Sequence, residues 1–200
     1  EMREADEADK ARLALELESD NSLIHNINNL GQFLRCIGFE GTPESNAVYW
    51  VGMSNSSDFR FPRWDGLDAP ENQKFVFEEA SSAFLFYYNN NQPDPFIDNM
   101  QYIGDVNERD SSYRFNIRRS VAAYSAPLAG IHTTIDRKSG ILKFLHTSFG
   151  VSDKYNCSPV SETDKEKIFT KLYRNLHNYA FHKYDKNLKY LKSEKARKKF

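Results

Sequence analysis

Residues 131–146 read IHTTIDRKSGILKFLH, in which two runs of β-branched and apolar side chains flank the turn sequence RKSG. Gly140 supplies the left-handed backbone position that such a turn requires. We therefore expect a β-hairpin over residues 131–149. A half-buried antiparallel hairpin adopts the register that collects its apolar side chains on one face. That register pairs Ile135 with Leu142 and Thr133 with Phe144, and its apolar face holds Ile131, Ile135, Leu142 and Phe144.

Two further segments have the composition of strands. Residues 113–118 alternate apolar and polar side chains, which predicts a strand that buries Tyr113, Phe115 and Ile117. Residues 47–53 are rich in aromatic and branched side chains. Together with the hairpin, these strands predict an antiparallel sheet.

A long helix is predicted at the carboxyl end of the chain. Ser161 is a suitable N-cap, and Glu162 and Asp164 complement the helix dipole in the first turn. The basic side chains of the first turns fall on the side away from the apolar stripe. That stripe is expected to contain Ile168, Leu172, Leu176, Tyr179, Ala180, Tyr184, Leu188 and Leu191.

The amino-terminal residues also favour helices. Residues 4–18 have good helix propensity but only a thin apolar stripe. Residues 23–37 carry apolar side chains at three- and four-residue spacing, which predicts a buried second helix that ends at Gly38. Residues 19–22 offer N-cap side chains between the two. Without a break there, the two would form one long helix able to pair with another copy or another subunit.

The middle of the chain is harder to assign. Residues 54–70 are loop-like although they contain several aromatic side chains. In residues 71–90, Phe75 and Phe77 alternate as in a strand, but the later apolar spacing favours a helix. Residues 89–95, with two prolines and a run of asparagine, predict a surface loop.

The order of these elements predicts an α+β fold, an antiparallel β-sheet flanked by a long N-terminal helix and a long basic C-terminal helix. A chain of 200 residues suits one domain. We expect an exposed helical lead-in over residues 1–20, a single α+β domain over residues 21–192 and a basic tail over residues 193–200.

The composition excludes several classes of protein. With 40% hydrophobic and 28% charged residues, the chain is expected to be soluble and globular rather than disordered. No run approaches the roughly 20 apolar residues of a membrane-spanning helix. The sequence contains no phosphate-binding glycine loop, dinucleotide fingerprint or serine-hydrolase elbow, and we predict no cofactor and no metal. Cys36 and Cys157 are too few for a disulfide framework, and whether they pair is left open.

The two ends of the chain carry opposite charge: residues 1–20 have a net charge of −5 and residues 162–200 a net charge of +7. Basic side chains interleaved with tyrosines make nucleic-acid binding by residues 165–199 one alternative. We favour a solvated helix face, because lysines at every third residue from Lys183 onward spread around a helix of 3.6 residues per turn. The candidates for contact with a partner are Lys183, Lys186, Lys189 and Lys192.

His132 and His146 lie on the two strands of the expected hairpin and suggest a second alternative, a hydrolase or transferase that uses them. The favoured register places them on opposite faces, and a one-residue change in turn length would bring them side by side. His177 and His182, five residues apart, do not share a helix face.

The aromatic segment is the best candidate for a small-ligand site, lined by Trp50, Arg60, Arg63, Trp64 and Asp65. The opposing interpretation is that these rings cover the core. The leading hypothesis for the whole chain is a non-enzymatic binding or interaction module with a regulatory or sensory role. It would associate through its terminal helices with a protein partner or a second copy.

Overall fold

The computed structural model describes residues 2–40, 47–54, 58–65, 69–80, 83–89, 100–108, 112–120, 131–146 and 151–197. In chain order its elements are α1 (Met2–Asn29), β1 (Leu30–Gly38), β2 (Ala47–Ser54), β3 (Phe59–Asp65), β4 (Lys74–Ala80), β5 (Ala83–Asn89), β6 (Met100–Glu108), β7 (Ser112–Ser120), β8 (Ile131–Asp136), β9 (Ile141–His146), β10 (Val151–Pro159) and α2 (Glu162–Arg197). Two long helices and antiparallel strands confirm the predicted α+β class.

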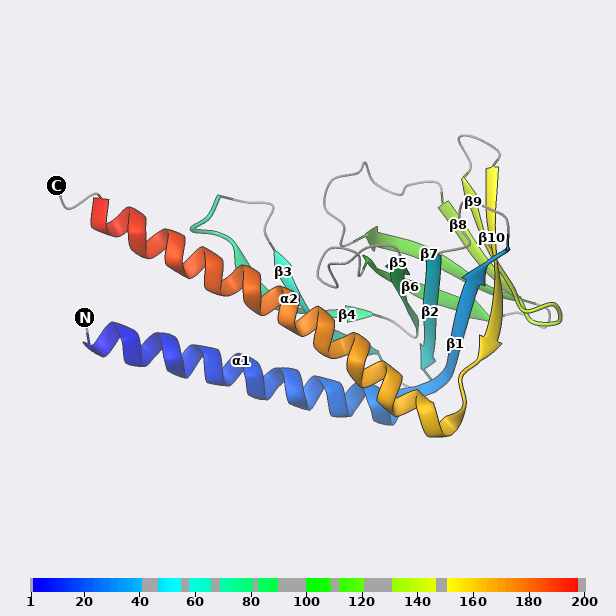
Figure 1. Ribbon diagram of the computed structural model, residues 1–200, viewed down its shortest axis with the longest axis horizontal. Helices are drawn as coiled ribbons and strands as arrows, with labels where there is room; N and C mark the ends of the chain where they lie inside the picture. The colour runs from blue at the N-terminus through cyan, green and yellow to red at the C-terminus, as the bar shows by residue number, and fades with distance from the viewer. Residues whose placement is uncertain are drawn as a thin grey trace.

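Eight of these strands close into an antiparallel barrel (Figure 1). Their order around the barrel is β1, β2, β5, β6, β7, β8, β9 and β10, and β10 pairs again with β1. Each barrel strand therefore lies beside its neighbour in the chain, with β3 and β4 inserted as a separate two-stranded sheet between β2 and β5. An eight-stranded barrel of this kind is narrow enough for side chains to fill or for one small ligand to occupy.

The predicted hairpin is confirmed in position and register. Ile135 pairs with Leu142 and Thr133 with Phe144, and Gly140 has a φ of 68° in the turn. Both Ile135 and Leu142 are buried. The Asp136 carboxylate holds the turn, because its Oδ1 accepts hydrogen bonds from Lys138 N at 3.0 Å, Ser139 N at 2.7 Å and Ser139 Oγ at 2.9 Å.

The other two predicted strands are also confirmed, as β2 and β7. Tyr113 pairs with Ile135 and Phe115 with Thr133, which places both positions and Ile117 on the face that Ile135 shares. The burial of these three side chains lies outside the described part of the structure. The same is true of the loop expected at residues 89–95, apart from Asn89, which ends β5.

The barrel wall separates two hydrophobic clusters. The interior cluster contains Cys36, Val51, Met53, Ala83, Leu85, Ile135, Leu142 and Tyr155. The outer cluster lies where β1, β2 and β5 meet β3 and the two helices, and it contains Leu23, Leu30, Phe33, Phe59, Phe61, Phe84, Phe86, Phe169, Leu172, Tyr173 and Leu176. Strands of the barrel that touch the helices are thus buried on both faces.

Strand β1 corrects the prediction of a helix that ends at Gly38. Residues 30–38 are a strand, although burial at Leu30, Phe33 and Cys36 repeats every three residues as in a helix. Phe33 is buried outside the barrel and Cys36 inside it, so two different faces create this spacing. A register shift between Leu30 and Gln32 adds a local irregularity.

The segment from residue 54 to residue 90 was also assigned wrongly from the sequence. The expected loop contains β3, and the expected helix is replaced by β4 and β5. In β5, Leu85 faces the barrel interior while Phe84 and Phe86 face the outer cluster. Apolar side chains on both faces produce a continuous run, which periodicity alone cannot separate from a buried helix.

Helix α2 is confirmed together with its cap, since Asp164 N donates to Ser161 Oγ at 3.2 Å and Lys165 N to Ser161 O at 2.9 Å. Leu172, Leu176 and Ala180 of the predicted stripe are buried. The prediction missed Phe169, Tyr173 and Phe181, which are buried as well.

Helix α1 runs without a break across residues 19–22, so the continuous form of the N-terminal helix is the one observed. Its last residue is Asn29, and β1 follows directly. The division of the chain at residues 20 and 192 stays a prediction, with α1 and α2 extending across those two positions.

Cys36 and Cys157 form a disulfide that joins β1 to β10. The two residues are directly opposite each other in the ladder that closes the barrel. The bond therefore links the first strand of the barrel to the last, across 121 residues of sequence. Cys157 is consequently no free thiol.

Candidate functional site: the helical arm and the barrel mouth

Helices α1 and α2 lie side by side and extend past the barrel together as a helical arm (Figure 1). The Arg174 guanidinium contacts the Asp20 carboxylate at 2.7 Å. Arg12 lies 3.9 Å from the Asp185 carboxylate, with its guanidinium 5.9 Å from the centre of the Phe181 ring. These contacts hold the acidic helix against the basic one.

The inward face of α1 is unusually polar for a buried surface. Ser19, Ser22 and Asn26 are all buried. Tyr173 Oη on α2 donates a hydrogen bond to Ser19 O at 3.0 Å. Burial raises the pKa of Tyr173 to about 12, so the hydroxyl stays protonated and remains a donor at neutral pH.

Three large apolar side chains are exposed on the outward face of α1, among polar residues such as Asp20 and Asn28. Leu13, Leu17 and Ile24 are 66%, 62% and 57% exposed. At about 100° per residue these three positions fall within a sector of about 40°. Leu17 and Ile24 each lie two residues, or about 200°, from the buried Ser19 and Asn26, so they point nearly opposite to the buried face. The inward face of α1 thus combines polar side chains with Leu23, which is buried in the outer cluster, while three large apolar side chains lie on the outward face.

The lysines singled out in the sequence lie on the distal half of α2. Lys186, Lys189 and Lys192 are exposed, and Lys183 is half-buried. The Lys183 ammonium lies 5.4 Å from the centre of the Tyr179 ring. Tyr190, two turns further, is 49% exposed. The side chains at 179, 183 and 190 share one side of α2, because their spacings of four and seven residues are close to whole helical turns.

A histidine lies beside this interface. His177 packs against the Phe181 ring, with ring centres 4.4 Å apart, and its Nε2 is buried. Partial burial lowers the pKa of His177, and the nearby Arg174 guanidinium acts in the same direction. Its hydrogen bond to Asn178 and the carboxylates of Asp20 and Glu16 oppose the shift.

The structure disperses the two tryptophans of the predicted ligand site. Trp50 stacks on Phe33, with ring centres 5.6 Å apart, at the outer cluster. Trp64 packs against Tyr184 of α2 at 6.3 Å, in a separate cluster with Phe75 and Phe181. Both rings are partly buried against these clusters, which favours the interpretation that they cover the core.

The charged residues of the predicted site lie on β3, where they form ion pairs. Arg63 is buried and its Nη2 lies 3.4 Å from Asp65 Oδ1. Arg60 Nη1 donates to Glu18 Oε1 at 3.1 Å, and Arg60 lines an open groove of about 670 Å³ between α1 and the β3–β4 sheet. The groove also holds Asn21, Ser22, His25, Asp58 and Glu79.

The register of β8 and β9 places His132 and His146 on opposite faces. His132 pairs with Leu145 and His146 with Ile131. Their side chains lie outside the described part of the structure. Among the residues that it describes, no three His, Cys, Asp or Glu side chains converge as metal ligands would.

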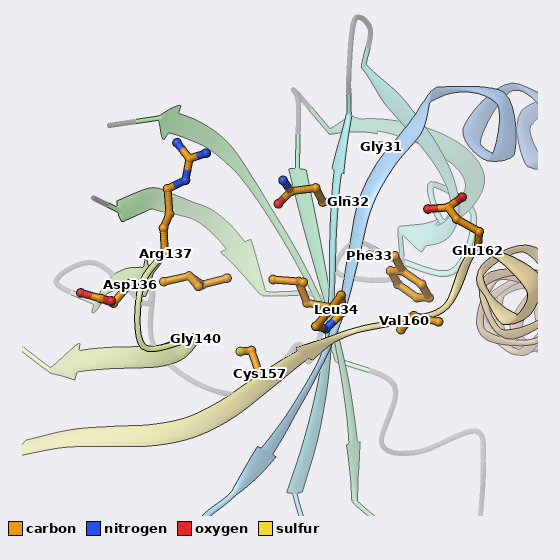
Figure 2. Close-up of a pocket in the computed structure, with 12 residues that line it drawn as sticks. Gly31, Gln32, Phe33, Leu34, Asp136, Arg137, Gly140, Cys157, Val160 and Glu162 are labelled. Carbon is orange, nitrogen blue, oxygen red and sulfur yellow. The ribbon is translucent and has the colours of Figure 1, made fainter. Parts of the chain in front are cut away.

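A pocket of about 440 Å³ lies at one mouth of the barrel (Figure 2). Three separate segments form it: the start of β1, the turn between β8 and β9, and the passage from β10 into α2. Its lining residues are Gly31, Gln32, Phe33, Leu34, Ile135, Asp136, Arg137, Gly140, Cys157, Pro159, Val160 and Glu162. Its size is within the range of sites for small ligands, which often occur at barrel mouths.

The sequence indicated an exposed helix with a thin apolar stripe over residues 4–18, but it placed Ile24 in a buried helix and did not predict this pocket. The stripe had a local signal, the spacing of four and seven residues between Leu13, Leu17 and Ile24. The pocket had no local signal, because the start of β1 lies about a hundred residues before the other two walls in the chain and meets them only through barrel closure.

No known protein family, curated protein or solved structure matches this chain. Neither described helix contains an apolar window that would carry it across a lipid bilayer. The function must therefore be inferred from the surfaces themselves.

Proposed function

We propose that this protein is a non-enzymatic interaction module with a regulatory or sensory role, which self-associates through its helical arm. In the proposed dimer, the outward face of α1 packs against the distal half of α2 from a second copy. The observation that carries the proposal is the exposed stripe of Leu13, Leu17 and Ile24. Aligned apolar side chains on a polar helix are typical of a surface that is covered in a complex.

Charge selects which helix covers the stripe. Residues 2–29 have seven acidic and three basic side chains, and residues 162–197 have five acidic and ten basic ones. Two α1 helices would repel each other, whereas α1 and α2 attract. A twofold axis generates two such contacts at once, since α1 of each copy then meets α2 of the other.

The two faces also match in spacing. Leu13, Leu17 and Ile24 repeat after four and seven residues, and so do Tyr179, Lys183 and Tyr190. Tyrosine rings and the aliphatic part of a lysine can cover leucines while their polar ends remain in water. The neighbouring Lys186 would lie near the acidic side chains of the opposing α1.

Light scattering coupled to size-exclusion chromatography would test the proposal over a concentration series at low and high salt. We expect a dimer whose dissociation constant rises with salt, because screening weakens the charge contribution. Leu17→Glu should give a monomer, and Leu17→Met, which keeps the apolar surface, should dimerise. A wild-type chain that is monomeric at every concentration and both salts would refute self-association.

A mixing experiment distinguishes α1–α2 contacts from α1–α1 contacts. The double variant Lys183→Glu/Lys186→Glu should be monomeric alone, like Leu17→Glu. Mixed together, the two variants retain one intact contact, between the native α1 of one and the native α2 of the other, and a weak heterodimer should form. If the lysine variant dimerises normally, α2 is not the occupant of the stripe.

A further inference from the structure

We propose that the pocket at the barrel mouth binds a small uncharged aliphatic molecule whose one polar group both donates and accepts hydrogen bonds, as a primary amide does. The polar group would pair with the side-chain amide of Gln32, and the aliphatic part would lie against Leu34, Ile135 and Val160. The proposal goes beyond self-association, because it concerns the barrel instead of the helical arm. Either proposal can therefore fail without the other.

The walls of the pocket that face the barrel interior are apolar. Ile135 is 2% exposed and belongs to the interior cluster, against which Leu34 and Cys157 pack. Val160 is half-buried and packs against the outer cluster. Figure 2 shows Leu34 extending into the space between β1 and the β8–β9 turn. An aliphatic ligand would be removed from water here, and contacts of this kind supply most of the affinity for a small ligand.

The charged groups at the rim are already engaged within the molecule. The Asp136 carboxylate accepts hydrogen bonds from the turn amides, and Arg137 also has a partner. Glu162 Oε2 lies 2.8 Å from Lys165 Nζ. Two acidic and two basic groups thus balance at this rim. A charged ligand would lose hydration without gaining a free counter-ion, so the rim favours an uncharged one.

Gln32 supplies the polar contact. Among the residues that line the pocket, all of them within the described ranges, it has the only polar side chain that makes no hydrogen bond or ion pair. Gln32 and Leu34 lie two residues apart on β1 and therefore on the same face. Figure 2 shows both side chains directed toward the β8–β9 turn. A side-chain amide has donors and an acceptor, so it can make two reciprocal hydrogen bonds with a primary amide.

The pocket is held in shape by contacts between its walls. Val160 N donates to Phe33 O at 2.8 Å and Cys157 N to Gly140 O at 2.8 Å. The Cys36–Cys157 disulfide joins β1 to β10. Because the three segments are already connected, a ligand would not have to order them, and less binding energy is lost.

Titration of the full ¹⁵N-labelled chain with hexanamide, hexanoate and hexylamine at neutral pH, followed by NMR, would test this proposal. We expect shifts centred on residues 31–34, 135–140 and 157–162. Hexanamide should bind about tenfold more tightly than either charged ligand, because neither ion finds a free partner at the rim.

Substitutions at Gln32 test whether its amide orients the ligand. Gln32→Met keeps the length of the side chain but removes its polar group, and it should weaken hexanamide binding about tenfold through the loss of two neutral hydrogen bonds. Gln32→Glu introduces a carboxylate without a partner and should make hexylamine the tightest ligand. The control is Arg35→Met, at an exposed position of β1 outside the pocket, which should leave hexanamide binding unchanged.

Four results would each overturn the proposal. They are the absence of shifts with millimolar hexanamide, shifts centred outside the pocket, a charged ligand that binds the wild type as tightly as hexanamide does, and unchanged hexanamide binding in Gln32→Met. Since Gln32 and Arg35 are both exposed, the variants should fold, and a wild-type-like ¹⁵N spectrum before titration checks this.

Discussion

The side-chain amide of Asn26 on α1 makes two hydrogen bonds with the backbone of Arg60 on β3. Asn26 Nδ2 donates to Arg60 O at 2.7 Å, and Asn26 Oδ1 accepts from Arg60 N at 2.8 Å. Strand β3 pairs with β4 along one edge, and Asn26 occupies a place on the other edge that a neighbouring strand would take. The preceding residue of α1, His25, donates from Nε2 to Asp58 O at 2.8 Å. The helical arm is therefore attached to the inserted sheet through backbone groups.

Replacing Asn26 by Ala should destabilise the protein by about 2 kcal/mol, because the change leaves both backbone groups of Arg60 without these partners in a part-buried place. Urea denaturation would give the free energy of unfolding. Asn21→Ala is the matched control, since Asn21 is exposed on the same helix and the change in helix propensity is the same. Equal stability of the two variants would show that the Asn26 bonds are not needed for stability.

Gly52 is required by the outer cluster. It pairs with Phe84 across β2 and β5, and a Cβ atom at position 52 would overlap the Phe84 ring. That ring is fully buried and packs within 4.9 Å of both Phe59 and Phe86, measured between ring centres. Gly52→Ala should therefore cost about 1–3 kcal/mol, although the same change in an open strand is favourable.

A double-mutant cycle would establish the cause of the Gly52 effect. In a Phe84→Leu background the smaller side chain leaves room for the methyl group, so Gly52→Ala should cost clearly less there. An equal cost of Gly52→Ala in both backgrounds would mean that the Phe84 ring is not what excludes the Cβ atom.

Elements with a local signal could be predicted from the sequence. The β8–β9 hairpin was predicted in register because turn chemistry at Gly140 and alternation in the flanking strands agree. The start of α2 was predicted because Ser161 and Asp164 form a cap. In both cases the deciding interactions lie within a few residues of each other.

Elements whose burial depends on distant parts of the chain were assigned wrongly. β1 and β5 are buried on one face in the barrel interior and on the other face against the helices. Neither strand therefore shows the alternation of apolar and polar side chains that is typical of a strand with one solvent-exposed face. β3, in the segment expected to be a loop, contains Pro62, which is tolerated because β3 belongs to a two-stranded sheet with edge strands. The barrel-mouth pocket depends on closure between β1 and β10, which no local pattern reveals.

His177 should make the stability of the protein depend on pH. Because burial lowers its pKa in the folded state, the unfolded chain binds more protons between that value and about 6.5. The free energy of unfolding should thus fall as the pH drops through this window and be unaffected by His177 above it. In His177→Gln the fall between pH 7.5 and 5 should be smaller than in the wild type.

The control for this titration is His182→Gln, which changes an exposed histidine of the same helix. It should retain the wild-type pH dependence. Identical profiles for the wild type and His177→Gln would show that the proton uptake responsible does not belong to His177.

The Cys36–Cys157 disulfide should be the largest single contribution to stability that one bond makes in the described structure. It joins strands β1 and β10, which close the barrel and lead directly into α1 and α2, and it encloses 121 residues of chain. Cross-linking so long a loop restricts the unfolded chain by about 5 kcal/mol in the chain-entropy account, and measured values are commonly about 2–4 kcal/mol. Cys36→Ala/Cys157→Ala should lower the free energy of unfolding by about 2–4 kcal/mol.

The control is wild-type protein in reductant, which breaks the disulfide but leaves the buried sulfur atoms in place. Comparing it with the double variant gives the small loss of packing at Cys36, which can then be subtracted. If reduced and oxidised wild type unfold at the same denaturant concentration, the β1–β10 ladder and the two helices hold the barrel closed without the bond.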